Sequence, residues 1–103
     1  MIDIKIEKHK KLLSLSAIGH AGYAPYGADI VCAGVSSIIM GLCASLDGSC
    51  TETHISSGRA IIRTRDCRRS EYMFRFAEKA LGLIAAEYPK HLKLSVNTNA
   101  RQA

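Results

Sequence analysis

Residues Gly19–Ser36 read G-H-A-G-Y-A-P-Y-G-A-D-I-V-C-A-G-V-S, and they join a glycine-rich loop to an apolar helix. Glycines and a proline oppose regular structure over residues 19–28, which predicts a loop there. Asp29 is a favourable N-cap, because its carboxylate can accept hydrogen bonds from the unpaired N–H groups of a first helical turn. We therefore predict a helix from this residue to about 47–49. Its sheet-facing side is formed by apolar residues at helical spacing: Val31, Val35, Ile38 and Leu42.

Two strand patterns precede this junction. Isoleucines at every second position from Ile2 to Ile6 alternate with charged residues, which predicts a strand over residues 2–8. The same alternation returns after a polar turn, in Leu13, Leu15 and Ala17. The two segments together predict a hairpin.

A second hairpin, a second helix and a last strand follow the first helix. Residues 52–56 and 60–65 flank a serine-glycine turn and carry the alternation of a hairpin. Ser70 is the predicted N-cap of the second helix, which Pro89 terminates. Residues 92–96 alternate again and predict the last strand. The apolar residues of the second helix keep helical spacing: Met73, Phe76, Ala77, Ala80, Leu83 and Ile84.

The predicted order of elements is ββαββαβ, which describes an α+β fold in which one sheet carries two helices. A chain of 103 residues can bury one modest core and no second one. We therefore predict a single domain over residues 1–97. The polar tail over residues 98–103 is expected to be frayed.

The composition is that of a globular protein, with 48% hydrophobic and 22% charged residues. No apolar run approaches the ~18–20 residues of a membrane span. The N-terminal segment alternates apolar and charged residues, unlike a secretory signal, so we expect a cytoplasmic protein. Neither the cysteines nor the histidines have the close spacing of a metal site, and we expect reduced thiols, no metal and no cofactor. The cysteines are Cys32, Cys43, Cys50 and Cys67.

Cys32 and His20 are the candidate reactive groups. With Asp29 as the cap, Cys32 is the third residue of the helix, where the helix dipole favours a thiolate. His20 is the only histidine near enough in sequence for the loop to fold it back as a base. A helix cysteine is most often a small core hydrophobe, and a loop histidine is usually solvated. The coincidence of thiol, cap and histidine favours a nucleophile. The sequence leaves open whether Asp29 orients His20 or only caps the helix.

The formal net charge is +5, and six of the basic residues form two clusters. One cluster is Lys8, Lys10 and Lys11, and the other is Arg65, Arg68 and Arg69. Each cluster fits either a solvated turn or a surface that faces RNA or the ribosome. Neither cluster has interleaved aromatic residues or belongs to an RNA-binding motif, so we favour solvated turns.

The pattern G-H-A-x-x-A-x-x-G-x-D-I-V-C-A-G-V-S over residues 19–36 resembles the signature of the bacterial ribosomal-processing cysteine proteases, the Prp family. The length and the order of elements are similar as well, so the resemblance spans nearly the whole chain. It implies a cytoplasmic cysteine endopeptidase, usually a homodimer. The family removes a short N-terminal extension from a large-subunit ribosomal protein, the twenty-seventh in the usual naming. By matching positions, Cys32 would be the nucleophile and His20 the general base, with Gly19, Asp29 and Ser36 supporting the site.

The implied reaction is acyl transfer, with thiolate attack on a peptide carbonyl and water releasing the acyl-enzyme. From helix geometry, the backbone N–H groups of Cys32 and Ala33 are candidates for stabilising the oxyanion. Three residues of the loop are predicted to form a mobile flap over the peptide: Tyr23, Pro25 and Tyr26. Gly19 would allow a sharp turn before His20, and Ser36 could hydrogen-bond near the sulfur.

The alternative is a module without enzymatic activity that binds the ribosome or RNA through its basic clusters. It predicts sensitivity to substitutions at Lys10, Lys11, Arg68 and Arg69 rather than at the thiol. A redox role for Cys32 is a distant third hypothesis, because no other cysteine is placed in sequence to resolve an oxidised form.

Overall fold

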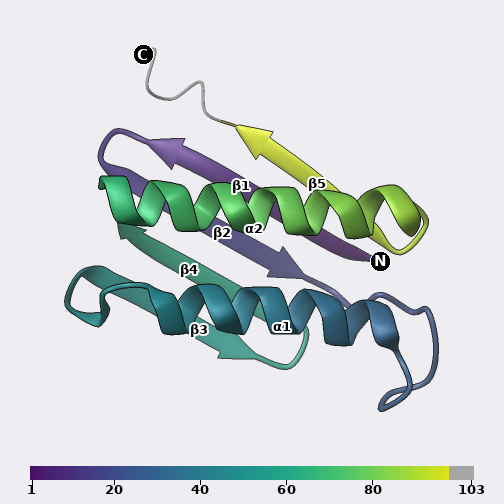
Figure 1. Ribbon diagram of the computed structural model, residues 1–103. Helices are drawn as coiled ribbons and strands as arrows, with labels where there is room; N and C mark the ends of the chain where they lie inside the picture. The colour runs from purple at the N-terminus through teal and green to yellow at the C-terminus, as the bar shows by residue number, and fades with distance from the viewer. Residues whose placement is uncertain (98–103) are drawn as a thin grey trace.

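The computed structural model describes residues 1–97, and within them it contains one five-stranded sheet and two α-helices (Figure 1). The predicted order ββαββαβ and the α+β class are confirmed. The predicted fraying of residues 98–103 lies outside the described residues. The elements are β1 (Ile2–His9), β2 (Leu12–Ile18), α1 (Ile30–Ser45), a 3-10 turn (Gly48–Cys50), β3 (Thr51–Ser56), β4 (Arg59–Arg65), α2 (Arg68–Glu87) and β5 (Leu92–Asn97).

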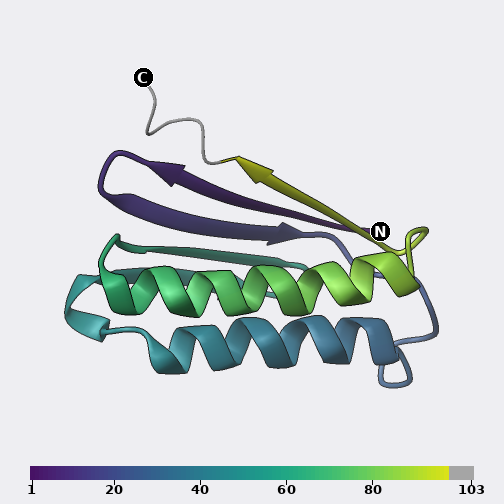
Figure 2. The same ribbon diagram turned by 45° about the horizontal axis from the view of Figure 1, so that its top comes forward.

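The strand order is β3-β4-β2-β1-β5, with β5 parallel to β1 and every other pair antiparallel. The register aligns Ile6, Leu15 and Ile62 across three neighbouring strands, and all three are buried. Residues one position away along each strand point to the other face. Both helices cover the same face of the sheet, as Figure 2 shows, and no other element within residues 1–97 covers the opposite face. The isoleucines at every second position of β1 therefore lie on the face of the sheet that the helices cover.

The first helix buries a slightly different set of residues from the predicted one. Val31, Val35 and Leu42 are buried as predicted, but Ile39 is buried and Ile38 only partly so. Residues 38 and 39 both continue a helical stripe, and they differ by about 100° around the helix. Ile38 instead shares a small surface depression with Phe76 of α2.

The second helix begins three residues earlier than predicted. Its N-cap is Cys67, whose sulfur accepts the N–H of Ser70 at 3.5 Å, while the Ser70 hydroxyl accepts the N–H of Cys67 at 2.9 Å. Ser70 was the predicted cap because serine is a preferred N-cap and cysteine is not. The serine occupies the third helical position of a capping box instead.

The buried side of α2 consists of Phe74, Ala77 and Leu81, of which only Ala77 belongs to the predicted apolar stripe. Phe76 and Leu83 from that stripe are 72% and 75% exposed. The apolar residues of α2 extend more than halfway around the helix, so periodicity alone did not specify which of them face the sheet. The predicted end before Pro89 is confirmed, since the helix closes at Glu87.

Candidate active site

The start of α1 is held by Asp29, whose carboxylate binds both the helix and the loop before it. Oδ1 accepts the N–H groups of Val31 and Cys32, each at 3.0 Å. Oδ2 accepts the N–H of Tyr23 at 3.0 Å and that of Ala24 at 3.4 Å. The hydrogen bond from Cys32, followed by those from the other amides, lowers the pKa of the Asp29 carboxyl from its usual value. The predicted N-cap is confirmed, and the carboxylate makes no hydrogen bond to His20 among the described residues.

Cys32 lies in the first turn of α1, half-buried at the edge of the helix that faces the loop. The N–H of Ala21, itself buried, donates a hydrogen bond to its sulfur at 3.3 Å. The sulfur therefore has a backbone donor aimed at it, at the start of a helix that the Asp29 carboxylate caps. The thiol thus has the partial cover and the backbone hydrogen bond that are compatible with a nucleophile.

His20 is placed by two glycines. Gly19 has φ +105°, a conformation that glycine adopts without strain, and its N–H donates to the carbonyl of Gly58 at 2.8 Å. A Cβ added at Gly58 would lie 2.7 Å from Nε2 of His20, so the imidazole lies directly against the backbone of the β3–β4 turn. The predicted sharp turn at Gly19 is confirmed. The backbone of the hairpin turn supports the His20 ring, and a side chain larger than that of glycine at position 58 would displace the ring.

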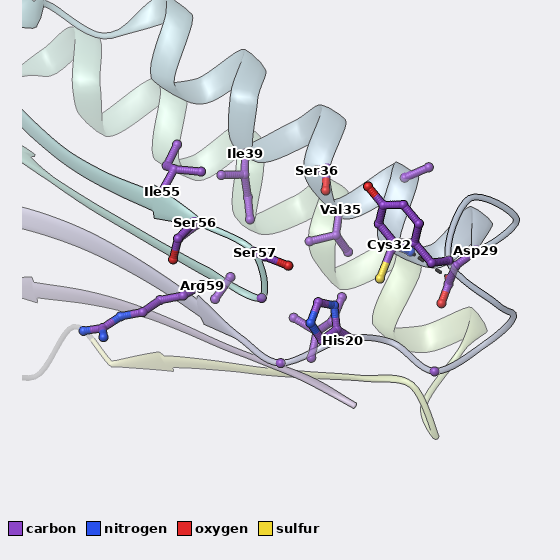
Figure 3. Close-up of a pocket in the computed structure, with 18 of the residues that line it drawn as sticks. His20, Asp29, Cys32, Val35, Ser36, Ile39, Ile55, Ser56, Ser57 and Arg59 are labelled. Atoms are coloured by element: carbon purple, nitrogen blue, oxygen red, sulfur yellow. Dashed lines mark hydrogen bonds between the residues drawn. The ribbon is translucent and has the colours of Figure 1, made fainter.

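His20, Cys32 and Ser36 line one open pocket of about 900 Å³ between α1 and the β3–β4 hairpin. In Figure 3 the sulfur of Cys32 points into this pocket on the side where the His20 ring lies. The opposite wall is formed by residues 55–60, and the floor includes apolar side chains such as Ile39. A pocket of this size can hold several residues of an extended peptide. The expected hydrogen bond from Ser36 near the sulfur is not observed, since its hydroxyl has no partner among the described residues.

The three residues of the predicted flap lie in different surroundings. Tyr26 is fully exposed and lines the pocket. Tyr23 turns away from the pocket and packs edge-on against Tyr88 and His91, with ring centroids 5.3 and 5.4 Å apart. Pro25 closes a turn in which its carbonyl accepts the N–H of Ala28 at 2.9 Å. One side of the loop therefore packs on the α2–β5 connection, and of these three residues only Tyr26 lines the pocket.

The prediction that Cys32 and Ala33 supply oxyanion donors is wrong for this structure. The N–H of Cys32 is bound to the Asp29 carboxylate, and that of Ala33 donates to the Asp29 carbonyl at 3.0 Å. An N-cap consumes the first-turn amides that an oxyanion would need. The cap and the oxyanion site were inferred from the same helix end, and they compete for the same donors.

Three residues of the site surroundings were missed at the sequence level, namely Gly58, Tyr88 and His91. His91 contacts the loop twice, through the ring of Tyr23 and through a hydrogen bond of 2.9 Å between its Nδ1 and the carbonyl of Ala21. These residues are 38 or more positions from His20 in sequence. A glycine in a hairpin turn was a visible signal for Gly58, but nothing local indicated that a histidine would lie against it.

Further features bear on cofactors and location. All four cysteines are free thiols. Residues 1–97 contain no group of three or more His, Cys, Asp or Glu side chains that could hold a metal ion. None of the helices in the described chain is long and apolar enough to cross a membrane.

A thiol in the first turn of a capped helix and a histidine on the same pocket are groups that a cysteine protease site can use. Residues 1–93 match the family model described as "Cysteine protease Prp". The chain therefore belongs to the Prp family of cysteine proteases, and the predicted resemblance and enzyme class are confirmed.

Relatives with this fold cover nearly the whole chain. The ribosomal processing cysteine protease Prp of Staphylococcus aureus is 28% identical over 101 residues, which cover 91% of this chain and 95% of that protein. A crystal structure of S. aureus Prp with a covalently linked product peptide superposes with a TM-score of 0.84 at 26% identity, over 93% of this chain and 99% of that one. A Streptococcus mutans protein, 24% identical with a TM-score of 0.72 over 95% of each chain, shares the fold.

Proposed function

We propose that this protein is an endopeptidase that removes the N-terminal extension of a large-subunit ribosomal protein, the twenty-seventh, through a dyad of Cys32 and His20. The observation that carries the proposal is the placement of both side chains on one open pocket, with the Ala21 N–H donated to the sulfur. The other three cysteines lack this combination. Of the four histidines, His20 is the one that lines the pocket.

In the proposed reaction the Cys32 thiolate attacks the scissile carbonyl, and a new C–S bond forms as the carbonyl oxygen takes up the electron pair. His20, protonated when the thiol ionises, gives that proton to the leaving amine as the C–N bond breaks. The peptide C-terminal to the cut departs, and the acyl group stays on sulfur. Water, deprotonated by His20, then attacks the thioester and regenerates the thiol.

The supporting residues act through position. Asp29 fixes the start of α1 and the loop at the same time, so it sets the distance between the two parts of the dyad. Gly19 allows the turn that brings His20 back over the pocket. We assign Ser36, whose hydroxyl lines the pocket one turn after Cys32, a role in contacting the bound peptide. Tyr26 at the tip of the loop is the part of the flap that would close over it.

The substrate assignment is supported by relatives and by the shape of the pocket. The S. aureus relative is named a ribosomal processing protease, and its crystal structure contains a covalently linked product peptide. The pocket of this chain is open along α1 and the β3–β4 hairpin rather than closed around one side chain. A shape of this kind suits an extended chain terminus.

We also propose that the protein acts as a homodimer in the cytoplasm. Tyr72, Phe76 and Leu83 follow one another along the solvent side of α2, and each is at least 60% exposed. Aromatic and leucine side chains in such a row are typical of a contact surface between subunits. Sedimentation equilibrium of the wild type and of Phe76→Glu/Leu83→Glu tests this, since the double variant should sediment as a monomer. A wild-type monomer at ~100 µM would refute the dimer.

A cleavage assay with the full-length precursor of the ribosomal protein tests the proposed function. The wild type should release one defined N-terminal peptide, read by intact mass. Cys32→Ala and His20→Ala should release none. The matched controls are Cys67→Ser, which keeps a good helix cap, and His54→Ala, which changes an exposed residue of β3 that does not line the pocket. Both variants should cleave at the wild-type rate. Cleavage by Cys32→Ala at the same bond would refute the dyad, and intact precursor with an unreactive Cys32 would favour the basic, non-enzymatic module.

A further inference from the structure

The two basic clusters, 54 residues apart in sequence, meet at the end of the molecule opposite the pocket. The first cluster lies in the β1–β2 turn and the second at the β4–α2 junction, and Figure 1 shows these segments together at one end of the sheet. We call this surface the basic end; it consists of Lys8, Lys10, Lys11, Arg65, Arg68 and Arg69.

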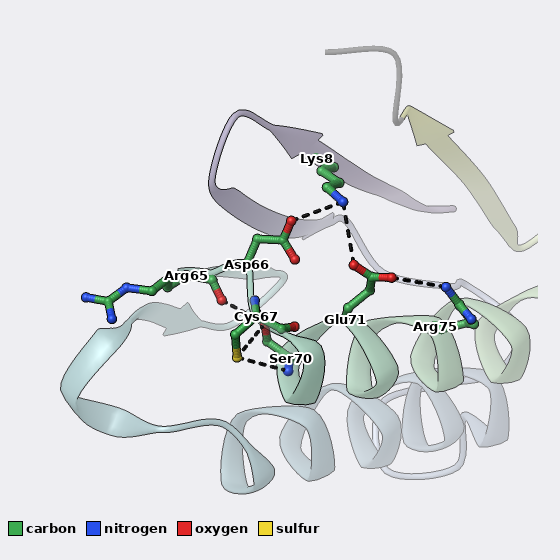
Figure 4. Close-up of polar contacts among 7 residues, drawn as sticks. All are labelled: Lys8, Arg65, Asp66, Cys67, Ser70, Glu71 and Arg75. Atoms are coloured by element: carbon green, nitrogen blue, oxygen red, sulfur yellow. Dashed lines mark hydrogen bonds and ion pairs between the residues drawn. The ribbon is translucent and has the colours of Figure 1, made fainter. Parts of the chain in front are cut away.

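Backbone pairing and ion pairs hold the two clusters together. The N–H of Asp66 donates to the carbonyl of Lys11 at 2.7 Å, and Leu12 pairs with Arg65 across the β2–β4 ladder. The ammonium of Lys8 lies 3.0 Å from the carboxylate of Asp66 and 3.5 Å from that of Glu71 (Figure 4). The positions of the basic residues are therefore set by the fold.

Positive charge exceeds negative charge at this end. Six cations and four carboxylates, those of Glu7, Asp47, Asp66 and Glu71, lie in or beside these segments, so an excess of two positive charges gathers here. Asp66 and Glu71 bind Lys8. Hydrogen bonds from Ser49, and behind them the charges of Arg69 and Arg65, lower the pKa of Asp47, which keeps its carboxyl ionised.

Three basic residues of this surface form no ion pair within residues 1–97 and are available to a ligand. Lys10, Lys11 and Arg68 are exposed, and none of them forms an ion pair with another residue of the described chain. Lys10 lies at the tip of the turn with φ +57°, where it projects from the fold. Exposed cations without an ion pair can contact an extended polyanion without any change of backbone.

We propose that the basic end binds the phosphate backbone of RNA, independently of base sequence. A protein partner would need an apolar contact core, and two large apolar side chains are described as exposed near these cations: Leu12, and Tyr72 one turn along α2 from Arg68. Two separate side chains do not form such a core. A membrane surface would need a row of apolar residues to insert, and these two side chains do not make one. RNA needs neither, because the release of counterions from phosphates supplies the affinity.

This site leaves the proteolytic pocket free. The eight residues of β1 separate the two ends of the sheet, a span of about 25 Å at the usual rise per strand residue. A peptide in the pocket and RNA at the basic end would therefore not compete. The inference stands apart from the proposed cleavage reaction, since RNA binding can be measured on a protein with no active thiol.

Fluorescence anisotropy of a labelled oligouridylate of about 20 nucleotides, titrated with the full-length protein between about 50 and 200 mM salt, tests the proposal. Affinity should fall with salt along a log–log slope of about −2 to −4, as for three to five contacted phosphates. Lys10→Glu/Lys11→Glu and Arg68→Glu/Arg69→Glu should each weaken binding about tenfold or more. Both variants should keep the wild-type melting temperature and cleavage rate.

The matched control is Lys79→Glu/Lys93→Glu, which removes the same net charge from the middle of α2 and from β5. Its affinity should stay within about threefold of the wild type, because charges beyond a Debye length of about 10 Å are screened. Equal loss in this control would overturn the proposal, since net charge alone would then explain binding. No binding at about 100 µM and low salt, or equal binding of a polyglutamate peptide, would overturn it as well.

Discussion

Replacing Gly58 by alanine should reduce activity far more than stability. The residue has φ +71°, where an alanine costs about 1 kcal/mol after the gain from a less flexible unfolded chain. For a domain of this size that loss lowers Tm by about 4–8 °C. The added methyl carbon would also lie 2.7 Å from Nε2 of His20.

The effect on activity follows from that contact. An ordinary carbon contact needs about 3.5 Å, so the His20 ring must move by nearly 1 Å. The ring is at the end of a flexible side chain and can move at little cost to folding. A misplacement of about 1 Å in a catalytic group can reduce the rate about 100-fold. We therefore expect kcat/KM of Gly58→Ala to fall by about two orders of magnitude.

The assay measures kcat/KM on a peptide that spans the cleavage site, alongside thermal unfolding. Gly27→Ala is the matched control, because Gly27 also has positive φ, +90°, and its added methyl would meet no atom within 4 Å. It should lose a similar few degrees of Tm and less than about fivefold in rate. If Gly58→Ala keeps its full rate while its Tm falls, the His20 ring does not depend on the hairpin turn, and the reasoning fails.

Three further predictions concern the loop and the thiols. Asp29→Asn should lower Tm by several degrees at neutral pH. The pKa of this carboxyl is lowered in the folded state, so its contribution to stability is present above the unfolded value of about 3.8 and is lost as the pH falls below that value. Equal Tm differences between variant and wild type at pH 7 and at about pH 2 would contradict the cap. His91→Ala removes the hydrogen bond to the Ala21 carbonyl and the contact with the Tyr23 ring. The loss should lower kcat/KM about tenfold and speed proteolytic cleavage within residues 19–29. An unchanged rate of that cleavage would show that other contacts hold the loop. Cys67, whose pKa is lowered by hydrogen bonds from Ser70, should react with iodoacetamide before Cys43, whose pKa is raised by burial, and peptide mapping in which Cys43 reacts first would refute this order.

Local signals were sufficient for the order of elements and for the Asp29 cap. Strand alternation and an N-cap depend on neighbours within a few residues, so the sequence displays them directly. The choice between Ile38 and Ile39 was different, because both continue a helical stripe and only packing against the sheet and α2 separates them. The cap of α2 was misplaced for a chemical reason, since a cysteine sulfur accepts the hydrogen bond that statistics assign to serine.

The surroundings of the proposed catalytic pair depend on contacts between distant segments. His20 and Cys32 could be proposed from the sequence because they share one segment of 18 residues. Strand pairing brings Gly58 against His20, and the path of α2 brings His91 against the loop. These contacts between distant segments cannot be predicted from the local pattern of a single sequence. The same holds for the two basic clusters. Each cluster alone resembles a solvated turn, and only the fold shows that they lie side by side.

The contact between the first residue and Gly19 has a practical consequence. The carbonyl of Met1 lies against Gly19, directly before His20, and the N–H of Ile2 is bound to the carbonyl of His91 at 2.9 Å. A purification tag fused ahead of Met1 would begin beside the loop that carries His20, close to the proposed site. Asn97, which pairs with Glu7, lies at the far end of the sheet. Fusions for kinetic work on this enzyme belong after the last strand, and those for RNA binding belong before the first.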